Sequence, residues 1–257
     1  MWLIEVLLAT FFKEPVMIIN YFFYFIIYAF LGYVVEVCYV YIGSGKLTNR
    51  GYLYGPICPI YGYGAVIILL CLNPVYESGW WPLVFILGVT LTSLLEYATS
   101  YVMEVIFHMR WWDYSNRRFN LNGRICLKNS LLFGVLVMVV FYVIQPFISS
   151  IVSRIDSEVV KLFLFYLLLI LHIVDTVLST IKHINLTKVL LKIDEIIEDG
   201  KTLINGKTVQ LKAFLNNTKL MKRILRLNRH YPSLKVKDKN KRKLSLKEII
   251  NRIRTKE

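Results

Sequence analysis

The chain has 257 residues, 56% of them hydrophobic, and a formal net charge of +14 at pH 7. Soluble domains are about 45–50% apolar on a wider count that includes glycine, and several stretches here reach the roughly 20 apolar residues that cross a hydrocarbon core. These properties exclude a soluble single-domain enzyme and indicate a multi-pass membrane protein in contact with the lipid bilayer.

Five apolar stretches are predicted to span the membrane as helices, after an interfacial segment over residues 1–15. They cover residues 16–42, 52–72, 81–107, 129–148 and 159–181. Basic and acidic residues balance over 1–181, whereas 182–257 carries the whole positive charge. We therefore predict an all-α fold, a polytopic bundle of about five transmembrane helices over 16–181 with a basic, partly helical cytoplasmic tail over 182–257.

The connections between the predicted spans alternate in charge. The 43–50 and 108–128 connections are basic, the 73–80 connection has only Glu77, and the 149–158 connection is weakly acidic. Because Lys and Arg collect on the cytoplasmic side, we predict a cell-membrane protein with its N-terminus outside and its C-terminus in the cytoplasm.

The second predicted span is interrupted by glycine and proline in its first half. These residues are Gly51, Gly55, Pro56, Pro59 and Gly62. Proline removes a helix donor and clashes with the preceding turn, and interrupted spans point to transport sites. The alternative is a helix that begins only near Ile60, after an ordered turn, and the sequence leaves both open.

Ionisable side chains inside predicted spans are expensive and are functional candidates by default. Glu36 and Glu104 near span ends are expected to pair with arginines, with Arg50 as the partner of Glu36. Glu96 lies deeper, without a basic residue in its own span, which favours a functional role. His172 and Asp175 fit a proton relay or a metal half-site, but a plain hydrogen bond between the two is the favoured interpretation.

The Glu36–Arg50 pair can be tested by a double-mutant cycle. Glu36→Gln and Arg50→Gln together are expected to lower folded yield by less than the sum of the single effects, because each change leaves the other group without its partner. Additive losses of folded yield would show that Glu36 and Arg50 do not interact.

The 108–128 connection is rich in polar and aromatic residues. Asp113, Asn120 and Asn122 can form turns by bonding nearby backbone, and arginines such as Arg124 offer forks suited to phosphate or carboxylate. The segment is predicted to bind headgroups or to dock a subunit. The alternative is positive charge on the cytoplasmic side with a tryptophan anchor.

The tail is predicted to continue the fifth span as a helix to Gly200. A second helix over 208–229, a flexible segment over 235–243 and a short helix capped by Ser245 follow. Basic amphipathic helices attract anionic lipid, so lipid or a partner subunit is expected. No nucleic-acid recognition motif is visible, and nucleic acid is not expected. A solvated anchor is the alternative.

Catalytic and nucleotide-binding signatures are absent from the sequence, including GxxxxGK(S/T), HExxH and GxSxG. The four cysteines form neither a CxxC pair nor a metal spacing. We predict no cofactor, no metal and no catalytic residue.

Four strings are together specific: FLGYVVEVCY (30–39), LTNRGYLYGPICPIYGYGA (47–65), LLEYATSYVMEVIF (94–107) and WWDYSNRRFNLNGRICL (111–127). The sequence resembles, over residues 20–150, the CmpB-like family of bacterial membrane proteins described as putative ABC-transporter type IV. The resemblance implies a permease-like subunit with a separate ATPase and gives no substrate. The basic tail lies outside it.

Two other functions stay open, and so does a homo-oligomer. One is a membrane enzyme acting on lipid headgroups, with Glu36, Glu96 or Asp113 as acid or base and Arg50 and Arg124 holding phosphate. The other is a non-catalytic anchor or sensor that uses the tail.

Overall fold

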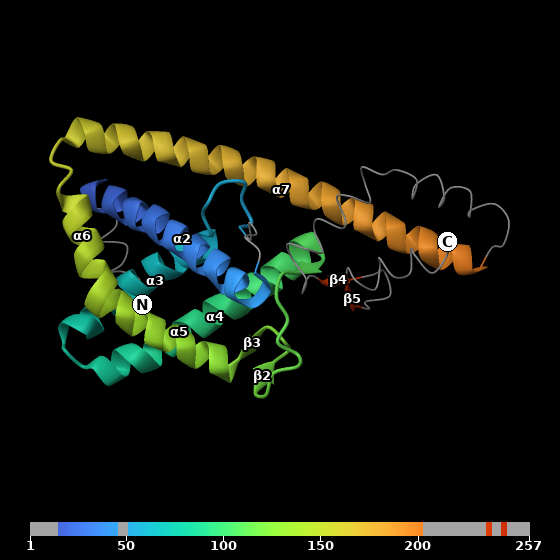
Figure 1. Ribbon diagram of the computed structural model, residues 1–257. Coiled ribbons are helices and arrows are strands. Elements are labelled where there is room, and N and C mark those ends of the chain that lie inside the picture. The colour runs from blue at the N-terminus through green and yellow to red at the C-terminus, as the bar shows by residue number, and fades with distance from the viewer. Residues whose placement is uncertain (1–14, 46–50, 203–234, 238–242, 246–257) are drawn as a thin grey trace, which may run out of the picture. The chain divides into compact units, whose positions relative to one another are not determined.

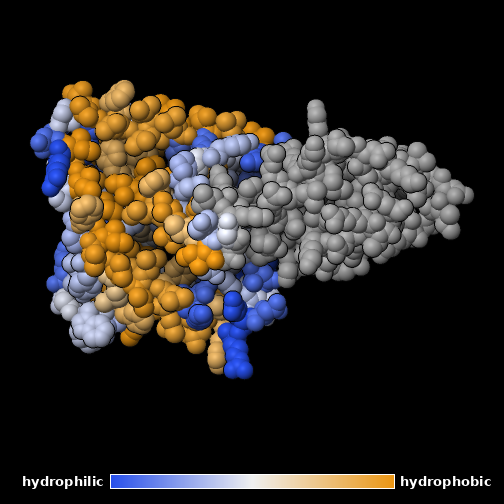
Figure 2. Space-filling model, in the orientation of Figure 1, coloured by the Kyte–Doolittle hydropathy of each residue, from blue (hydrophilic) through white to orange (hydrophobic). Residues whose placement is uncertain are grey.

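The computed structural model describes residues 15–45, 51–202, 235–237 and 243–245 (Figure 1). Five helices in this part are long and apolar enough to cross a membrane. They run Val16–Ile42, Pro59–Glu77, Trp81–Phe107, Leu127–Ser153 and Glu158–Asn185. The visible face of the described residues is largely hydrophobic (Figure 2), as lipid-facing helices require. The predicted all-α polytopic fold is confirmed.

The chain divides into two compact units. The first comprises residues 1–97 and 125–179, and the second comprises residues 98–124 and 180–257. Helices α4 (Trp81–Phe107) and α7 (Glu158–Thr202) contribute to both units.

The first unit is built on the close packing of α2 (Pro15–Ser44) against α3 (Pro59–Glu77). Glycines allow the approach, because a Cβ at Gly32 would overlap the Tyr61 ring and a Cβ at Gly62 would overlap Phe25. Small residues at such crossings are the usual means of packing helices in membranes. Around this pair lies an apolar core whose largest fully buried side chains are Leu72, Val84 and Phe141.

Gly32→Ala is expected to destabilise the first unit by about 1–3 kcal/mol, because the added methyl group meets the base of the Tyr61 side chain. The midpoint of thermal unfolding in detergent measures the effect. Gly64→Ala is the matched control, since its Cβ meets only the flexible end of Leu95 at 3.1 Å. Equal midpoints for the two variants would contradict the proposed packing.

The fourth span is bent and made of three pieces. Helix α5 (Leu127–Val139) passes through a π-helical turn η1 (Val140–Ile144) into α6 (Gln145–Ser153) (Figure 1). π turns insert one extra residue and often occur at functional positions. Here the turn precedes Gln145, whose Oε1 accepts a hydrogen bond of 2.9 Å from the hydroxyl of Tyr28 on α2.

The second unit contains short strands that the all-helical prediction did not include. Strand β2 (Asn120–Leu121) belongs to the second unit, whereas β3 (Ile125–Cys126) belongs to the first. Strand β1 (Met109–Arg110) pairs with β4 (Lys235–Lys237), and β4 pairs with β5 (Lys243–Ser245). Both pairings in the sheet of β1, β4 and β5 are antiparallel.

The prediction of a flexible segment over 235–243 is wrong at both ends. Residues 235–237 and 243–245 are strands, and Val236 stands opposite Leu244 in the ladder. The segments read KVK and KLS, so one apolar residue lies between polar ones, which is the period of a strand. The lysines in these segments led to the prediction of flexibility, although the alternation of polar and apolar residues is that of a strand.

The predicted helical extension of the fifth span is confirmed, and α7 ends at Thr202 rather than at Gly200. The interfacial segment over 1–14, the helix over 208–229 and the capped helix after Ser245 lie outside the described residues.

Candidate functional site

The second span begins later than the predicted residue 52. Residues 51–58 are not helical, and α3 begins at Pro59. Cys58 is extended, with φ −112° and ψ 96°, and Pro56 and Pro59 both lack an N–H donor. Of the two interpretations, the later helix start is the one observed.

This non-helical segment nevertheless lies beside the membrane-spanning helices. The Cys58 N–H donates to the Ala29 carbonyl oxygen at 2.8 Å, and Ala29 is fully buried near the middle of the first span, Val16–Ile42. Gly51 and Leu53 are buried as well. The segment is therefore non-helical backbone that is packed inside the protein before the helix begins.

Asp175 on α7 fastens this segment through its backbone. The Tyr54 N–H donates to Asp175 Oδ1 at 2.9 Å, and the Gly55 N–H donates to Oδ2 at 2.8 Å. Ser179, one turn further along α7, donates to Oδ1 at 3.0 Å. We call the two hydrogen bonds from the Tyr54 and Gly55 N–H groups to this carboxylate the Asp175 clamp. Hydrogen bonds from N–H groups to a carboxylate are among the stronger ones in proteins.

Gly55 is needed for the Asp175 clamp to close. A Cβ at this position would stand 2.9 Å from Asp175 Oδ2, which is closer than a carbon and an oxygen pack. Gly55 thus lets the carboxylate approach the backbone, a role separate from any freedom of its dihedral angles.

The expected hydrogen bond between His172 and Asp175 is not formed. In the part of the chain that the structure describes, His172 Nδ1 is buried without a hydrogen-bond partner. The imidazole packs against the Phe25 ring, with centroids 5.0 Å apart. Asp175 instead accepts from the backbone of residues 54 and 55, whose N–H groups the interrupted helix leaves without an intrahelical acceptor.

Glu36 is bonded by Tyr61, whose hydroxyl donates to Glu36 Oε1 at 2.8 Å. The Tyr61 ring crosses α2 at Gly32, one turn before Glu36 on the same face. This i, i+4 spacing of a glycine and a carboxylate was a usable signal for the contact. Arg50, the expected partner of Glu36, lies outside the described residues, so that pairing stays a prediction.

Glu96 is buried on α4, with 7% of its surface exposed. Three residues earlier on the same helix, the Ser93 hydroxyl donates to the Ser130 hydroxyl of α5 at 2.8 Å. A buried carboxylate within a span, Trp81–Phe107, stays a functional candidate.

In the second unit, Glu104 joins two buried arginines. Its Oε2 accepts from Arg110 Nε and pairs with Arg124 Nη2 at 2.9 Å. Arg110 Nη1 also donates to the Asn122 carbonyl oxygen at 2.9 Å and lies 4.0 Å from Asp113 Oδ1. The prediction that Glu104 pairs with arginine is confirmed, and two acidic and two basic groups balance in this cluster.

Arg124 is held on three sides. Besides the Glu104 carboxylate, its Nη1 donates to the Ser100 hydroxyl at 3.2 Å, and its guanidinium lies over the Tyr101 ring, 5.3 Å from the centroid. Its backbone carbonyl accepts from the Trp112 indole at 3.0 Å. These contacts fasten the loop to the end of α4.

The expected turns in the 108–128 connection are present. Asp113 Oδ1 accepts from the Ser115 N–H at 3.0 Å, and Asn120 Oδ1 accepts from the Gly123 N–H at 3.0 Å. Asn122 and Gly123 both have positive φ, and the Arg124 N–H returns to the Leu121 carbonyl at 2.9 Å. This is the two-residue Asn-Gly turn typical of a tight hairpin.

The structure thus separates the predicted site residues into two groups. The first unit holds Glu36, Gly51, Gly55, Pro56, Pro59, Gly62, Glu96, His172 and Asp175, and the second unit holds Asp113, Asn120, Asn122 and Arg124. The contacts that sequence reasoning missed are those of Tyr54 and Ser179 with Asp175 and that of Tyr61 with Glu36. Among the described residues, no group of three or more His, Cys, Asp or Glu side chains could hold a metal ion.

The comparisons with known proteins agree with the resemblance seen in the sequence. The family model described as putative ABC-transporter type IV matches residues 23–180, more than half of the chain. No curated protein and no solved structure matches. The matched range contains the Asp175 clamp, the Glu36–Tyr61 pair and the Glu104 cluster. The chain therefore belongs to the family described as putative ABC-transporter type IV.

Proposed function

We propose that the protein is the permease-like membrane subunit of an ABC-type transporter that works with a separate ATPase. The observation that supports this proposal is the non-helical segment over 51–58, which lies against Ala29 and is hydrogen-bonded to Asp175. Non-helical backbone packed between spanning helices forms substrate sites in membrane transporters. The absence of a nucleotide-binding motif from the sequence is consistent with an ATPase on another chain.

The polar groups of the first unit are proposed to line the path of the substrate. Glu36, Glu96, His172 and Asp175 lie on spanning helices. A substrate that replaced the Asp175 carboxylate could accept hydrogen bonds from the backbone N–H groups of Tyr54 and Gly55. We also propose the orientation with the N-terminus outside and the C-terminus in the cytoplasm, which places the 108–128 connection on the ATPase side.

The ATPase is proposed to dock on the exposed tip of that connection. Arg117, Arg118 and Phe119 are exposed there, while Asp113, Asn120, Asn122 and Arg124 shape the loop from within. Exposed arginines on a loop that is already ordered suit a docking contact. Because the rest of the loop is held by its own hydrogen bonds, binding costs little additional conformational entropy.

Photocrosslinking in the native membrane tests this proposal. A benzoylphenylalanine at Arg118 is expected to capture a protein with a Walker motif, whose ATPase rate changes when the purified chain is added in nanodiscs. The same group at Ser78, exposed on the connection between α3 and α4, is the control and should capture none. Repeated recovery of the chain alone from position 118 would count against a separate ATPase.

The lipid-headgroup enzyme is less well supported, because two of its proposed groups already have structural partners. Arg124 is bound to Glu104 and Asp113 shapes a turn. Turnover of a labelled lipid that disappears in Glu96→Gln would revive it. The anchor or sensor function becomes preferable if removal of residues 203–257 alone abolishes the phenotype of the full chain. Anionic lipid or a partner subunit is the partner proposed for that tail, and a homo-oligomer of the chain is proposed separately.

A further inference from the structure

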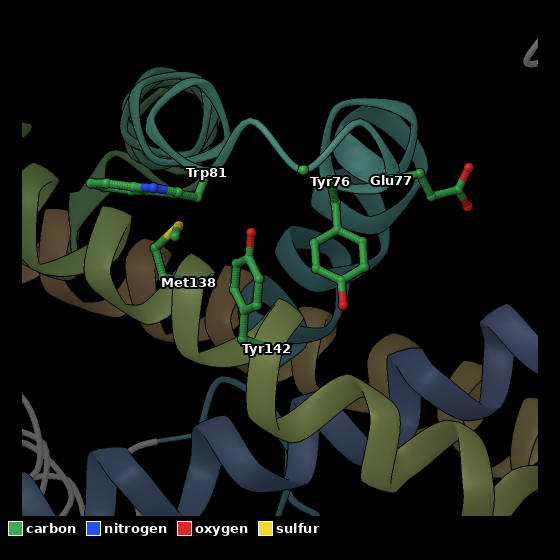
Figure 3. A pocket seen from close by; sticks show the side chains of 6 residues that line it. Tyr76, Glu77, Trp81, Met138 and Tyr142 are labelled. Atoms are coloured by element: carbon green, nitrogen blue, oxygen red, sulfur yellow. The ribbon is translucent and has the colours of Figure 1, made fainter.

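A hollow of about 620 Å³ lies where α3 ends, α4 begins and α5 passes into η1. Its lining residues are Tyr76, Glu77, Gly79, Trp81, Met138 and Tyr142 (Figure 3). We call it the aromatic hollow. All six residues belong to the first unit, and none takes part in the contacts of residues 51–58.

Three aromatic side chains form its walls. The Tyr76 and Tyr142 rings are nearly perpendicular, at 72°, with centroids 5.0 Å apart. The buried Phe141 ring stacks on the Tyr76 ring, with centroids 5.0 Å apart. Figure 3 shows the Trp81 indole on the opposite side, with the Met138 sulfur beside it. The hollow thus presents ring faces from three elements.

Among the residues that line the aromatic hollow, Glu77 is the charged one. The sequence contains no Lys or Arg between Arg50 and Arg110, and Glu77 is the acidic residue at the lip. Its carboxylate, which Figure 3 shows turned away from the rings, accepts a hydrogen bond of 2.6 Å from the Asn73 amide. Glu77 therefore attracts cations toward the hollow without filling it.

We propose that the aromatic hollow binds an organic cation, a quaternary or alkylated ammonium group. Such cations are attracted to the faces of tryptophan and tyrosine rings, and aromatic cages are their usual protein sites. The polarizable thioether of Met138 suits the methyl groups of such a cation. The ammonium group belongs either to a free amine or to a lipid headgroup.

The full-length protein in nanodiscs of anionic lipid provides the test, with choline as the probe and 3,3-dimethylbutan-1-ol as its neutral carbon isostere. Choline is expected to bind about tenfold more tightly than the isostere, because the two molecules differ only in charge. Each aromatic ring contributes a modest attraction to that charge. Equal affinities, or no binding of choline, would overturn the proposal and leave ordinary interfacial aromatics.

Two tryptophans offer a matched pair of variants. Trp81→Leu is expected to weaken choline binding about two- to five-fold, whereas Trp80→Leu, which changes a neighbour equally exposed but outside the hollow, should leave it unchanged. Tyr142→Phe should retain binding and Tyr142→Leu should lose it. Equal losses at positions 80 and 81 would overturn the site.

The two sources of the cation are separated by the lipid. In phosphatidylcholine nanodiscs, a headgroup already in the hollow would weaken the apparent affinity for free choline, and this loss would vanish in Trp81→Leu. Unchanged affinity assigns the site to a free amine. Because the assay needs no ATPase, its outcome is independent of the proposed transport function.

Discussion

Replacing Glu104 by glutamine is expected to destabilise the second unit by about 3–5 kcal/mol, because it leaves two buried arginines without the carboxylate that joins them. Of the contacts described above, Arg110 retains the Asn122 carbonyl and the more distant Asp113 carboxylate, and Arg124 retains the Ser100 hydroxyl. The midpoint of thermal unfolding in detergent and the monodisperse fraction on size-exclusion chromatography measure the loss.

The control for this variant is Glu77→Gln, which neutralises an exposed carboxylate and should leave the free energy of unfolding within about 0.5 kcal/mol of the parent. A second control is the pair Glu104→Gln with Arg124→Gln, which should cost less than the sum of the single changes. If Glu104→Gln matched Glu77→Gln, the buried cluster would have no part in stability.

Asp175→Asn is expected to loosen residues 51–58, with a loss of about 1–3 kcal/mol. The amide retains one carbonyl oxygen, but its NH₂ group must then face a backbone N–H, either that of Tyr54 or that of Gly55. The thiol of Cys58, buried at the end of the segment, reports the opening, and its rate of maleimide labelling should rise several-fold.

The labelling is best read in a chain whose Cys38 and Cys71 are replaced by serine and alanine, since these two are the more accessible thiols. Buried Cys126 then serves as an internal control and should stay unlabelled. Gly55→Ala should raise Cys58 labelling like Asp175→Asn, and Asp156→Asn, in the exposed connection before α7, should not. A rise at Cys126 as well would indicate general unfolding instead of a local release.

The spans could be predicted because each depends on a run of apolar residues, which composition alone reveals. The late start of α3 was one of two interpretations of Pro56 and Pro59, and the sequence could not choose between them. The Asn122–Gly123 turn carries a recognisable local signature, although the short strands on either side of it were not predicted.

The Asp175 clamp could not be predicted in the same way. It joins a side chain to the backbone N–H groups of Tyr54 and Gly55, 121 and 120 residues away in the chain, and backbone donors have no sequence signature. His172, three residues earlier on the same helix, was the partner that the sequence favoured. The pairing was decided by where the interrupted backbone left donors without acceptors.

This distance along the chain has a consequence for biogenesis. Residues 54 and 55 leave the ribosome 120 residues or more before Asp175, a delay of roughly 6–24 s at 5–20 residues per second. During that interval the nascent chain carries two apolar-flanked N–H groups with no acceptor from α7, which is unfavourable in lipid. Water, headgroups or an insertase must shelter this stretch until the fifth span arrives. A chain that terminates before residue 175 would expose it to quality-control proteases even though four complete spans had already been made.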